Sequence, residues 1–137
     1  QELLKGAHNF TTNTIKLALY TAGSGAPYTT ASTAYSSGVA NEVSGAGYTT
    51  GGNTLTSPVV ANQSNVATLT FAQTQFTSAT FGAAYAVIYN NSASDKLVVV
   101  LDFGGTKSCS NGTFTITFPS TSSGTPAGTD SLISITS

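Results

Sequence analysis

The carboxylates are the side chains with which this chain could carry out acid–base chemistry. There are five of them, and they are spread along the whole sequence: Glu2, Glu42, Asp95, Asp102 and Asp130. Glycoside hydrolysis needs two carboxyl groups that face each other across a sugar, and none of the five lies in a distinctive motif. Asp102 lies next to Phe103 at the end of an apolar run, where a carboxylate can cap a turn by accepting backbone N–H bonds. We therefore predict a structural role for Asp102.

His8 and Cys109 are the only imidazole and the only thiol in the chain. A zinc site would need more ligands than these two, and no G-x-S-x-G motif supports a Ser-His-Asp triad. A reactive thiol needs a neighbouring base, and His8 is remote from Cys109 in the sequence. We predict that His8 is a turn or packing residue and that Cys109 is an incidental free thiol.

Metal and phosphate sites have equally weak support in the sequence. Backbone carbonyls with Asp95 or Asp130 could hold calcium, but the Asp-x-Asp-x-Asp spacing of a calcium loop is absent. The glycines at 45–47 and 51–52 match no phosphate-binding loop. We predict no catalytic residue, no cofactor and no metal, and thus a protein that is not an enzyme. Four glycosylation sequons are expected by chance in a chain so rich in Ser and Thr; they begin at Asn9, Asn62, Asn90 and Asn111.

Three tyrosines, Tyr28, Tyr35 and Tyr48, are spaced along a Gly- and Ser-rich part of the chain. Two interpretations remain open for them. Their rings could form a platform on which a sugar stacks, or they could pack in an oligomer interface, where tyrosine is enriched.

Charge is scarce in this sequence. Charged residues make up 7% of the 137 residues, with four Lys, no Arg and a formal net charge of −1. Four scattered Lys cannot form the basic face that nucleic-acid binding or an anionic membrane surface requires. No apolar run, Leu97–Leu101 included, is long enough to span a bilayer. Disorder is also disfavoured, because 39% of the residues are hydrophobic and seven Phe and six Tyr are available for a core.

The stretch Thr80–Phe103 is the one around which the predicted fold is organised. It contains two apolar runs, Ala83–Tyr89 and Leu97–Phe103, separated by a cluster of turn-forming residues at 90–95. We predict two adjacent strands, buried on both faces and joined as a hairpin. Turns are predicted at Gly104–Lys107 and Lys107–Gly112.

Further strands are predicted on both sides of this hairpin. In Asn13–Thr21 the alternation places Ile15, Leu17 and Leu19 on one face and Lys16, Ala18 and Tyr20 on the other. The other predicted strands are Thr54–Val60, Asn65–Ala72, Gln73–Phe81, Thr113–Phe118 and Leu132–Ile135, with long loops at Ala22–Asn41 and Pro119–Asp130. Seven or eight short strands separated by turns predict an all-β fold, an antiparallel, jelly-roll-like β-sandwich. We expect an N-terminal arm or short helix within residues 1–12 and a single domain over residues 13–137.

Five segments, taken in order, resemble a known group of proteins: NTIKLALYT at 13–21, NEVSGAGYTTGGNTL at 41–55, AAYAVIYNN at 83–91, LDFGGTKS at 101–108 and NGTFTITFP at 111–119. Together they are similar to small β-rich proteins from the structural modules of tailed bacteriophages, over residues 3–119.

The resemblance implies a non-enzymatic virion structural protein. Within that group the expected role is capsid decoration or cement, on the capsid surface, as a homo-oligomer such as a trimer bound to the major capsid protein. The alternative is a tail or head-fibre component with a carbohydrate-binding, host-attachment role. In either case the loops Ala22–Asn41 and Pro119–Asp130 and the N-terminal arm are the expected contact regions, and neither nucleic acid nor a membrane is an expected partner.

Overall fold

Seven strands and one short helix make up the secondary structure of the computed structural model, which describes residues 6, 8–23, 25–29, 31–37, 39–63, 66–119 and 133–136. The predicted N-terminal helix falls almost entirely outside these residues. The elements are β1 (Ile15–Tyr20), β2 (Asn53–Thr54), β3 (Val59–Gln63), β4 (Val66–Thr70), β5 (Thr74–Asn90), the 3₁₀-helix η1 (Asn91–Ala93), β6 (Lys96–Ile116) and β7 (Ile133–Thr136).

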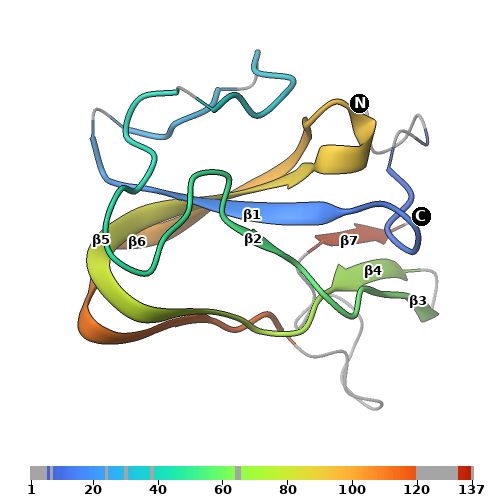
Figure 1. Ribbon diagram of the computed structural model, residues 1–137. Helices are drawn as coiled ribbons and strands as arrows, with labels where there is room; N and C mark the ends of the chain where they lie inside the picture. Colours follow the sequence, from blue (N-terminus) through green and yellow to red (C-terminus); the bar gives the residue numbers. More distant parts are fainter. Residues whose placement is uncertain are drawn as a thin grey trace.

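The strands form two antiparallel sheets (Figure 1). A four-stranded sheet has the order β2-β1-β5-β6, and a three-stranded sheet has the order β3-β4-β7. The predicted all-β, sandwich-like antiparallel character is therefore confirmed, whereas the jelly-roll connectivity and the domain limits stay predictions. Among the described residues, no helix is long and apolar enough to cross a membrane.

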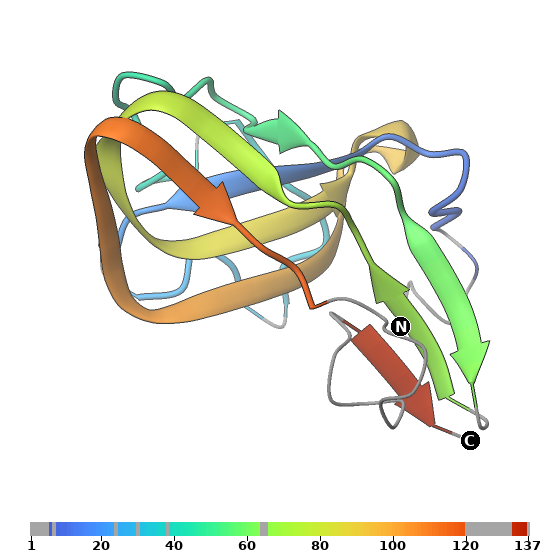
Figure 2. The same cartoon turned by 90° about the horizontal axis from the view of Figure 1, so that it is seen from below.

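The β5–β6 hairpin is the largest feature of the fold. Figure 2 shows both strands bending back together at one end of the molecule, so that each strand contributes to two layers. The bend coincides with several irregularities in the pairing of the two strands. Between the pairs Ala83↔Lys107 and Tyr85↔Asp102, for example, β5 has one residue and β6 has four, residues 103–106. Such bulges sharpen the local twist and let one hairpin form both walls around a core.

Two predicted turns are wrong for this reason. Gly104–Lys107 and Lys107–Gly112 both lie inside β6, which runs without interruption from Lys96 to Ile116. Gly104, Gly105 and Asn111 have positive φ angles. The turn-forming residues thus produce bulges in a bending strand. The predicted hairpin turn at 90–95 is confirmed, with η1 and the left-handed residues Ser94 and Asp95 closing it.

The inner core lies between the two layers that the bent hairpin forms. β1 gives it Ile15, Leu17 and Leu19, as the alternation predicted, and the far half of the hairpin gives it Phe76 and Phe114. Phe118 also joins this core, while Thr113, Thr115 and Thr117 are exposed.

The prediction that the central hairpin is buried on both faces is only half correct. Ala86, Val87, Ile88 and Tyr89 of β5 are at most 1% exposed. Residues 96–101 of β6 are all half-buried, because β6 is the edge strand of its sheet. On the side away from β5, only the start of β6 is paired in the described chain: the Leu97 N–H donates to the carbonyl of Thr33 at 3.0 Å.

The three-stranded sheet lies to one side of the bent hairpin (Figure 2). Leu69 of β4 and Phe71, which follows β4, join the inner core. Phe10, from the predicted arm, packs edge-on against Phe71 with ring centroids 6.5 Å apart. The strand predicted at Thr54–Val60 is split between β2 and β3, with Pro58 immediately before β3. Proline lacks the N–H that a continuous ladder would require.

Candidate functional site

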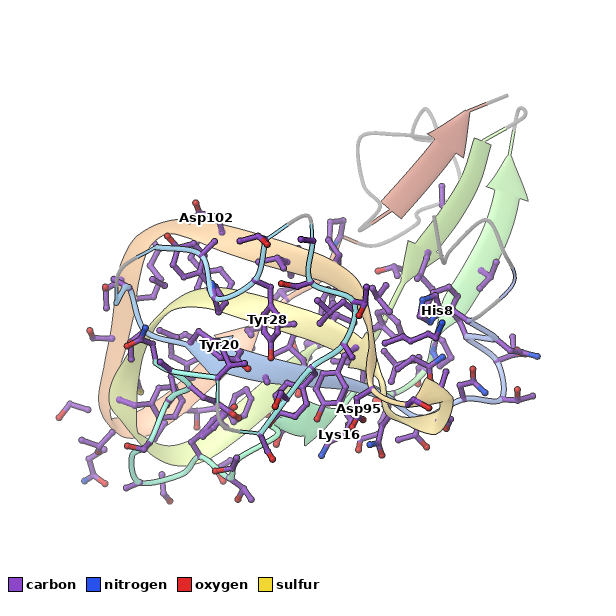
Figure 3. All side chains as sticks on the ribbon, turned by 90° about the horizontal axis from the view of Figure 1, so that it is seen from above. His8, Lys16, Tyr20, Tyr28, Asp95 and Asp102 are labelled. Atoms are coloured by element: carbon purple, nitrogen blue, oxygen red, sulfur yellow. The ribbon has the colours of Figure 1, made fainter. Side chains whose placement is uncertain are left out.

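A second buried cluster covers the outer face of β1 and β5. It contains Ala18 and Tyr20 from β1, Val87 and Tyr89 from β5, and the loop tyrosines Tyr28 and Tyr35. The long loop crosses over β1 in Figure 3, where Tyr20 and Tyr28 lie next to each other. Their hydroxyl oxygens are 3.1 Å apart and their rings meet edge to face. The described part of the loop Ala22–Asn41 therefore covers the outer face of the four-stranded sheet.

Glu42 is placed by the return of this loop along the free edge of β1. The Val43 N–H donates to the carbonyl of Leu19 at 2.9 Å, and the Thr21 N–H donates to the carbonyl of Asn41 at 2.8 Å. These bonds continue the antiparallel ladder past β2 and pair Glu42 with Tyr20.

The Glu42 carboxylate accepts three hydrogen bonds. The Tyr35 hydroxyl donates to Oε2 at 3.0 Å, and the Tyr48 hydroxyl and the Gly51 N–H donate to Oε1 at 2.7 and 2.6 Å. The Tyr48 hydroxyl in turn accepts the Leu19 N–H at 3.0 Å. We call these residues, together with Tyr89, the Glu42 network. A carboxylate with three donors is well satisfied.

Tyr89 joins this network through both its ring and its hydroxyl. Its ring stacks on that of Tyr35, with centroids 4.2 Å apart and planes 9° from parallel. Its hydroxyl donates to the carbonyl of Gly51 at 2.8 Å. Gly51 has a φ of +88°, a conformation that favours glycine, and it presents both its N–H and its carbonyl to the network.

Burial raises the pKa of Tyr20, Tyr35, Tyr48 and Tyr89 well above the ordinary value near 10. Hydrogen bonds to Glu42 add to the increase in pKa at Tyr35 and Tyr48, the bond to Tyr28 adds to it at Tyr20, and the charge of Asp95 adds to it at Tyr89. These phenols therefore remain protonated at neutral pH. They act as hydrogen-bond donors, not as bases or nucleophiles.

An open pocket of about 420 Å³ lies next to the Glu42 network. Gly51 and the stacked rings of Tyr35 and Tyr89 line one part of it, and the rest of the lining is polar: Lys16, Ser36, Ser37, Thr50, Asn91 and Asp95. Lys16 and Asp95 lie on the same side of the molecule in Figure 3. The pocket thus combines one cation, one carboxylate, hydroxyls and an amide.

The structure separates the other candidate residues from this pocket. Asp102 is exposed on β6, where its Oδ1 accepts the Gly104 N–H at 2.8 Å, a local cap of the kind predicted. Figure 3 shows Asp102 well apart from Lys16 and Asp95, and neither Asp102 nor His8 lines the pocket. His8 stacks on Phe10 and its Nδ1 lies 3.1 Å from Asn90 Nδ2. Cys109 is a half-buried free thiol packed against the inner core.

Metal ligands do not gather in the part of the chain that the structure describes. No group of three His, Cys, Asp or Glu side chains comes together there. Asp95, one of the two candidates for calcium, instead accepts a hydrogen bond from Asn91 Nδ2 at 2.7 Å. Glu2 and Asp130, the other calcium candidate, lie outside the described residues.

Neither interpretation of the three tyrosines describes where they lie. Tyr28 and Tyr35 are 7% and 9% exposed, and Tyr48 stacks on Phe76 at 5.6 Å. Their rings pack inside the chain's own cores. Asn90, the first residue of one sequon, is fully buried and donates to Asn13 Oδ1 at 2.8 Å.

The sequence alone did not single out three of the residues that line the pocket, Lys16, Gly51 and Tyr89. Lys16 and Tyr89 were assigned to predicted strands, and Gly51 to a predicted turn. Lys16 was one useful indication, since it is the single charge within the strand IKLALY.

Comparison with known proteins found no match to this chain among protein-family models, curated proteins or solved structures.

Proposed function

We propose that this chain is a non-enzymatic virion structural protein, a capsid decoration or cement protein. In this role it binds the major capsid protein and stabilises the shell as an oligomer, with a trimer as the expected state. The five segments that resemble phage structural proteins motivate the proposal, and the surface of the three-stranded sheet supports it.

The observation that carries the proposal is an apolar strand at the edge of that sheet. β3 is one of the two edge strands in the order β3-β4-β7, and its Val59 and Val60 are 44% and 55% exposed. Consecutive residues of a strand point to opposite faces, so the edge is apolar on both sides. An edge strand also presents unpaired N–H and C=O groups that can pair with another chain.

The scarcity of charge is consistent with this kind of contact. Only 7% of the residues are charged, so the surface would associate through apolar and backbone contacts. Salt screens such contacts far less than it screens exposed ion pairs. Both the major capsid protein of the shell and a neighbouring copy of this chain are suitable partners for such an edge strand.

The alternative is a tail or head-fibre component with a carbohydrate-binding, host-attachment role. The open polar pocket beside the Glu42 network favours this second function. The buried Tyr28 and Tyr35 do not contribute a stacking platform to it.

Particle composition tests the decoration role. Purified particles should contain the protein at a fixed ratio to the major capsid protein, measured by quantitative gel densitometry, and its native mass in solution should be that of a trimer. Val60→Lys should lower its occupancy on particles severalfold, because a charge at the edge opposes strand pairing. Thr113→Lys, at an exposed position of β6, is the matched control and should bind normally. Particles without the protein would refute the proposal, and a distal position on a fibre would favour the alternative.

A further inference from the structure

Three polar atoms converge on one point of the pocket floor. A Cβ placed on Gly51 would lie 3.2 Å from Lys16 Nζ, 3.3 Å from the Tyr89 hydroxyl and 3.8 Å from the Tyr35 hydroxyl. Because residue 51 is glycine, this space is left open to the pocket. Lys16 and Tyr89 are direct cross-strand partners in the β1–β5 register, so the sheet itself fixes their spacing.

The charges of the pocket are not neutralised within the described chain. Lys16 forms no ion pair with any carboxylate in the described part of the chain, although Asp95 lines the same pocket. Asp95 retains acceptor capacity, because the hydrogen bond that its side chain accepts from Asn91 uses Oδ1 and, among the described residues, Oδ2 accepts none. Two opposite charges that share a pocket without pairing can each bind a different group of one ligand.

The floor of the pocket is held rigidly. The Tyr35 and Tyr89 hydroxyl hydrogens are engaged by Glu42 and by the Gly51 carbonyl, so their oxygens face a ligand as acceptors. The stacked rings restrict both side chains. Preorganised groups of this kind lower the entropy cost of binding.

We propose that this pocket binds a sugar that carries a carboxylate, a uronic acid unit of a polysaccharide. Lys16 binds the carboxylate, and Asp95 accepts hydrogen bonds from sugar hydroxyls. Ser36, Ser37 and Asn91 both donate and accept, as sugar hydroxyls require.

The size and charge of the pocket select this class of ligand. Its volume of about 420 Å³ lies in the range of small-molecule sites and suits one or two sugar units. A doubly charged phosphate is disfavoured, because it would meet a single cation with the Asp95 carboxylate nearby. The assignment goes beyond the decoration role and does not depend on it, since isolated protein suffices to test it.

Titration of the full chain with D-glucuronate and D-galacturonate tests the proposal, with D-glucose and D-galactose as uncharged counterparts. Calorimetry should detect the uronates and give at least about tenfold weaker binding for the neutral sugars, since a hydrogen bond between charged groups is lost. In NMR spectra the amide resonances of Gly51 and Asn91 should shift on addition of uronate. Absence of uronate binding, or equal binding of uronate and neutral sugar, would overturn the proposal.

Variants identify the groups that bind the ligand. Lys16→Gln should weaken uronate binding about tenfold or more and remove the preference over neutral sugar, whereas Lys16→Arg should retain it. Asp95→Asn should weaken both sugar types, and asparagine tolerates the positive φ at this position.

Lys107→Gln and Asp102→Asn are the matched controls, because both residues are exposed on β6 outside the pocket. Thermal unfolding of each variant shows that the fold is retained. If Lys107→Gln weakened binding as much as Lys16→Gln, the attraction would be a general charge effect and the assigned site would be wrong.

Discussion

Both faces of the four-stranded sheet are buried, but the side chains that cover them differ in kind. On the inner face, Leu17 and Leu19 meet aliphatic and phenyl side chains from both halves of the bent hairpin. On the outer face, Ala18 and Tyr20 meet tyrosines supplied by a loop. The inner face needs only shape and apolar area, whereas each buried phenol on the outer face also needs a hydrogen-bond partner.

This difference explains why the pocket is found on the outer side. A loop that must satisfy buried hydroxyls brings a carboxylate, backbone groups and polar side chains with it. The buried members of the inner core are all aliphatic or phenyl side chains. A polar site therefore forms where a loop covers a sheet, and Tyr48 connects the two regions, with its ring on Phe76 and its hydroxyl on Glu42.

The largest expected difference between the faces appears at alkaline pH. The pKa values of Tyr20, Tyr35, Tyr48 and Tyr89 are raised in the folded protein, so the unfolded chain loses these protons first. The contribution of these tyrosines to the free energy of unfolding is fully present below pH 10. It falls as the pH rises above 10, by up to about 1.4 kcal/mol per tyrosine for each pH unit. Denaturant unfolding between pH 8 and 11 measures this loss. A Tyr20→Phe variant should show a shallower decline, and an unchanged slope would contradict the argument.

Removal of a ring from the inner face should have the next largest effect. Phe76 is 2% exposed, and Phe76→Ala should cost about 3–5 kcal/mol in the free energy of unfolding, because it removes buried surface and leaves a cavity. This cost should be the same at pH 8 and pH 9, since no titrating group is removed. Val60→Ala, at an exposed position, is the control and should cost less than about 0.5 kcal/mol. Equal losses for the two variants would be inconsistent with the inner core described above.

Removal of the carboxylate from the outer face should have a smaller effect. Glu42→Ala should cost about 3 kcal/mol, because it leaves the Tyr35 and Tyr48 hydroxyls and the Gly51 N–H without their acceptor. Glu42→Gln should cost less, since its carbonyl oxygen can still accept bonds. The free energy of unfolding and the near-ultraviolet circular dichroism of the tyrosines measure these effects. If Glu42→Ala proved neutral, Glu42 would not organise the loop.

Local patterns were sufficient for much of the fold. The alternation in IKLALY correctly assigned the two faces of β1, and that in TFTITF correctly placed Phe114, Ile116 and Phe118 in the core. The turn at 90–95 was also correct, because its residues favour that conformation whatever surrounds them.

Patterns failed where distant segments decide the outcome. GGT at 104–106 favours a turn by itself, but its pairing with β5 keeps it in a strand as a bulge. The partial exposure of residues 96–101 depends on the position of β6 at the edge of its sheet. No local feature of the sequence encodes either fact.

The residues whose side chains could take part in chemistry show the same division. From the sequence alone, it could be determined that charge is scarce, that the carboxylates are dispersed and that the chain has enough apolar residues for an all-β core. Only the tertiary structure decided that Glu42 accepts three hydrogen bonds and that Lys16, Gly51 and Asp95 share one pocket. The physical reason is that alternation is a property of neighbouring residues, whereas the pocket depends on the β1–β5 register and on the return of a loop along the edge of β1.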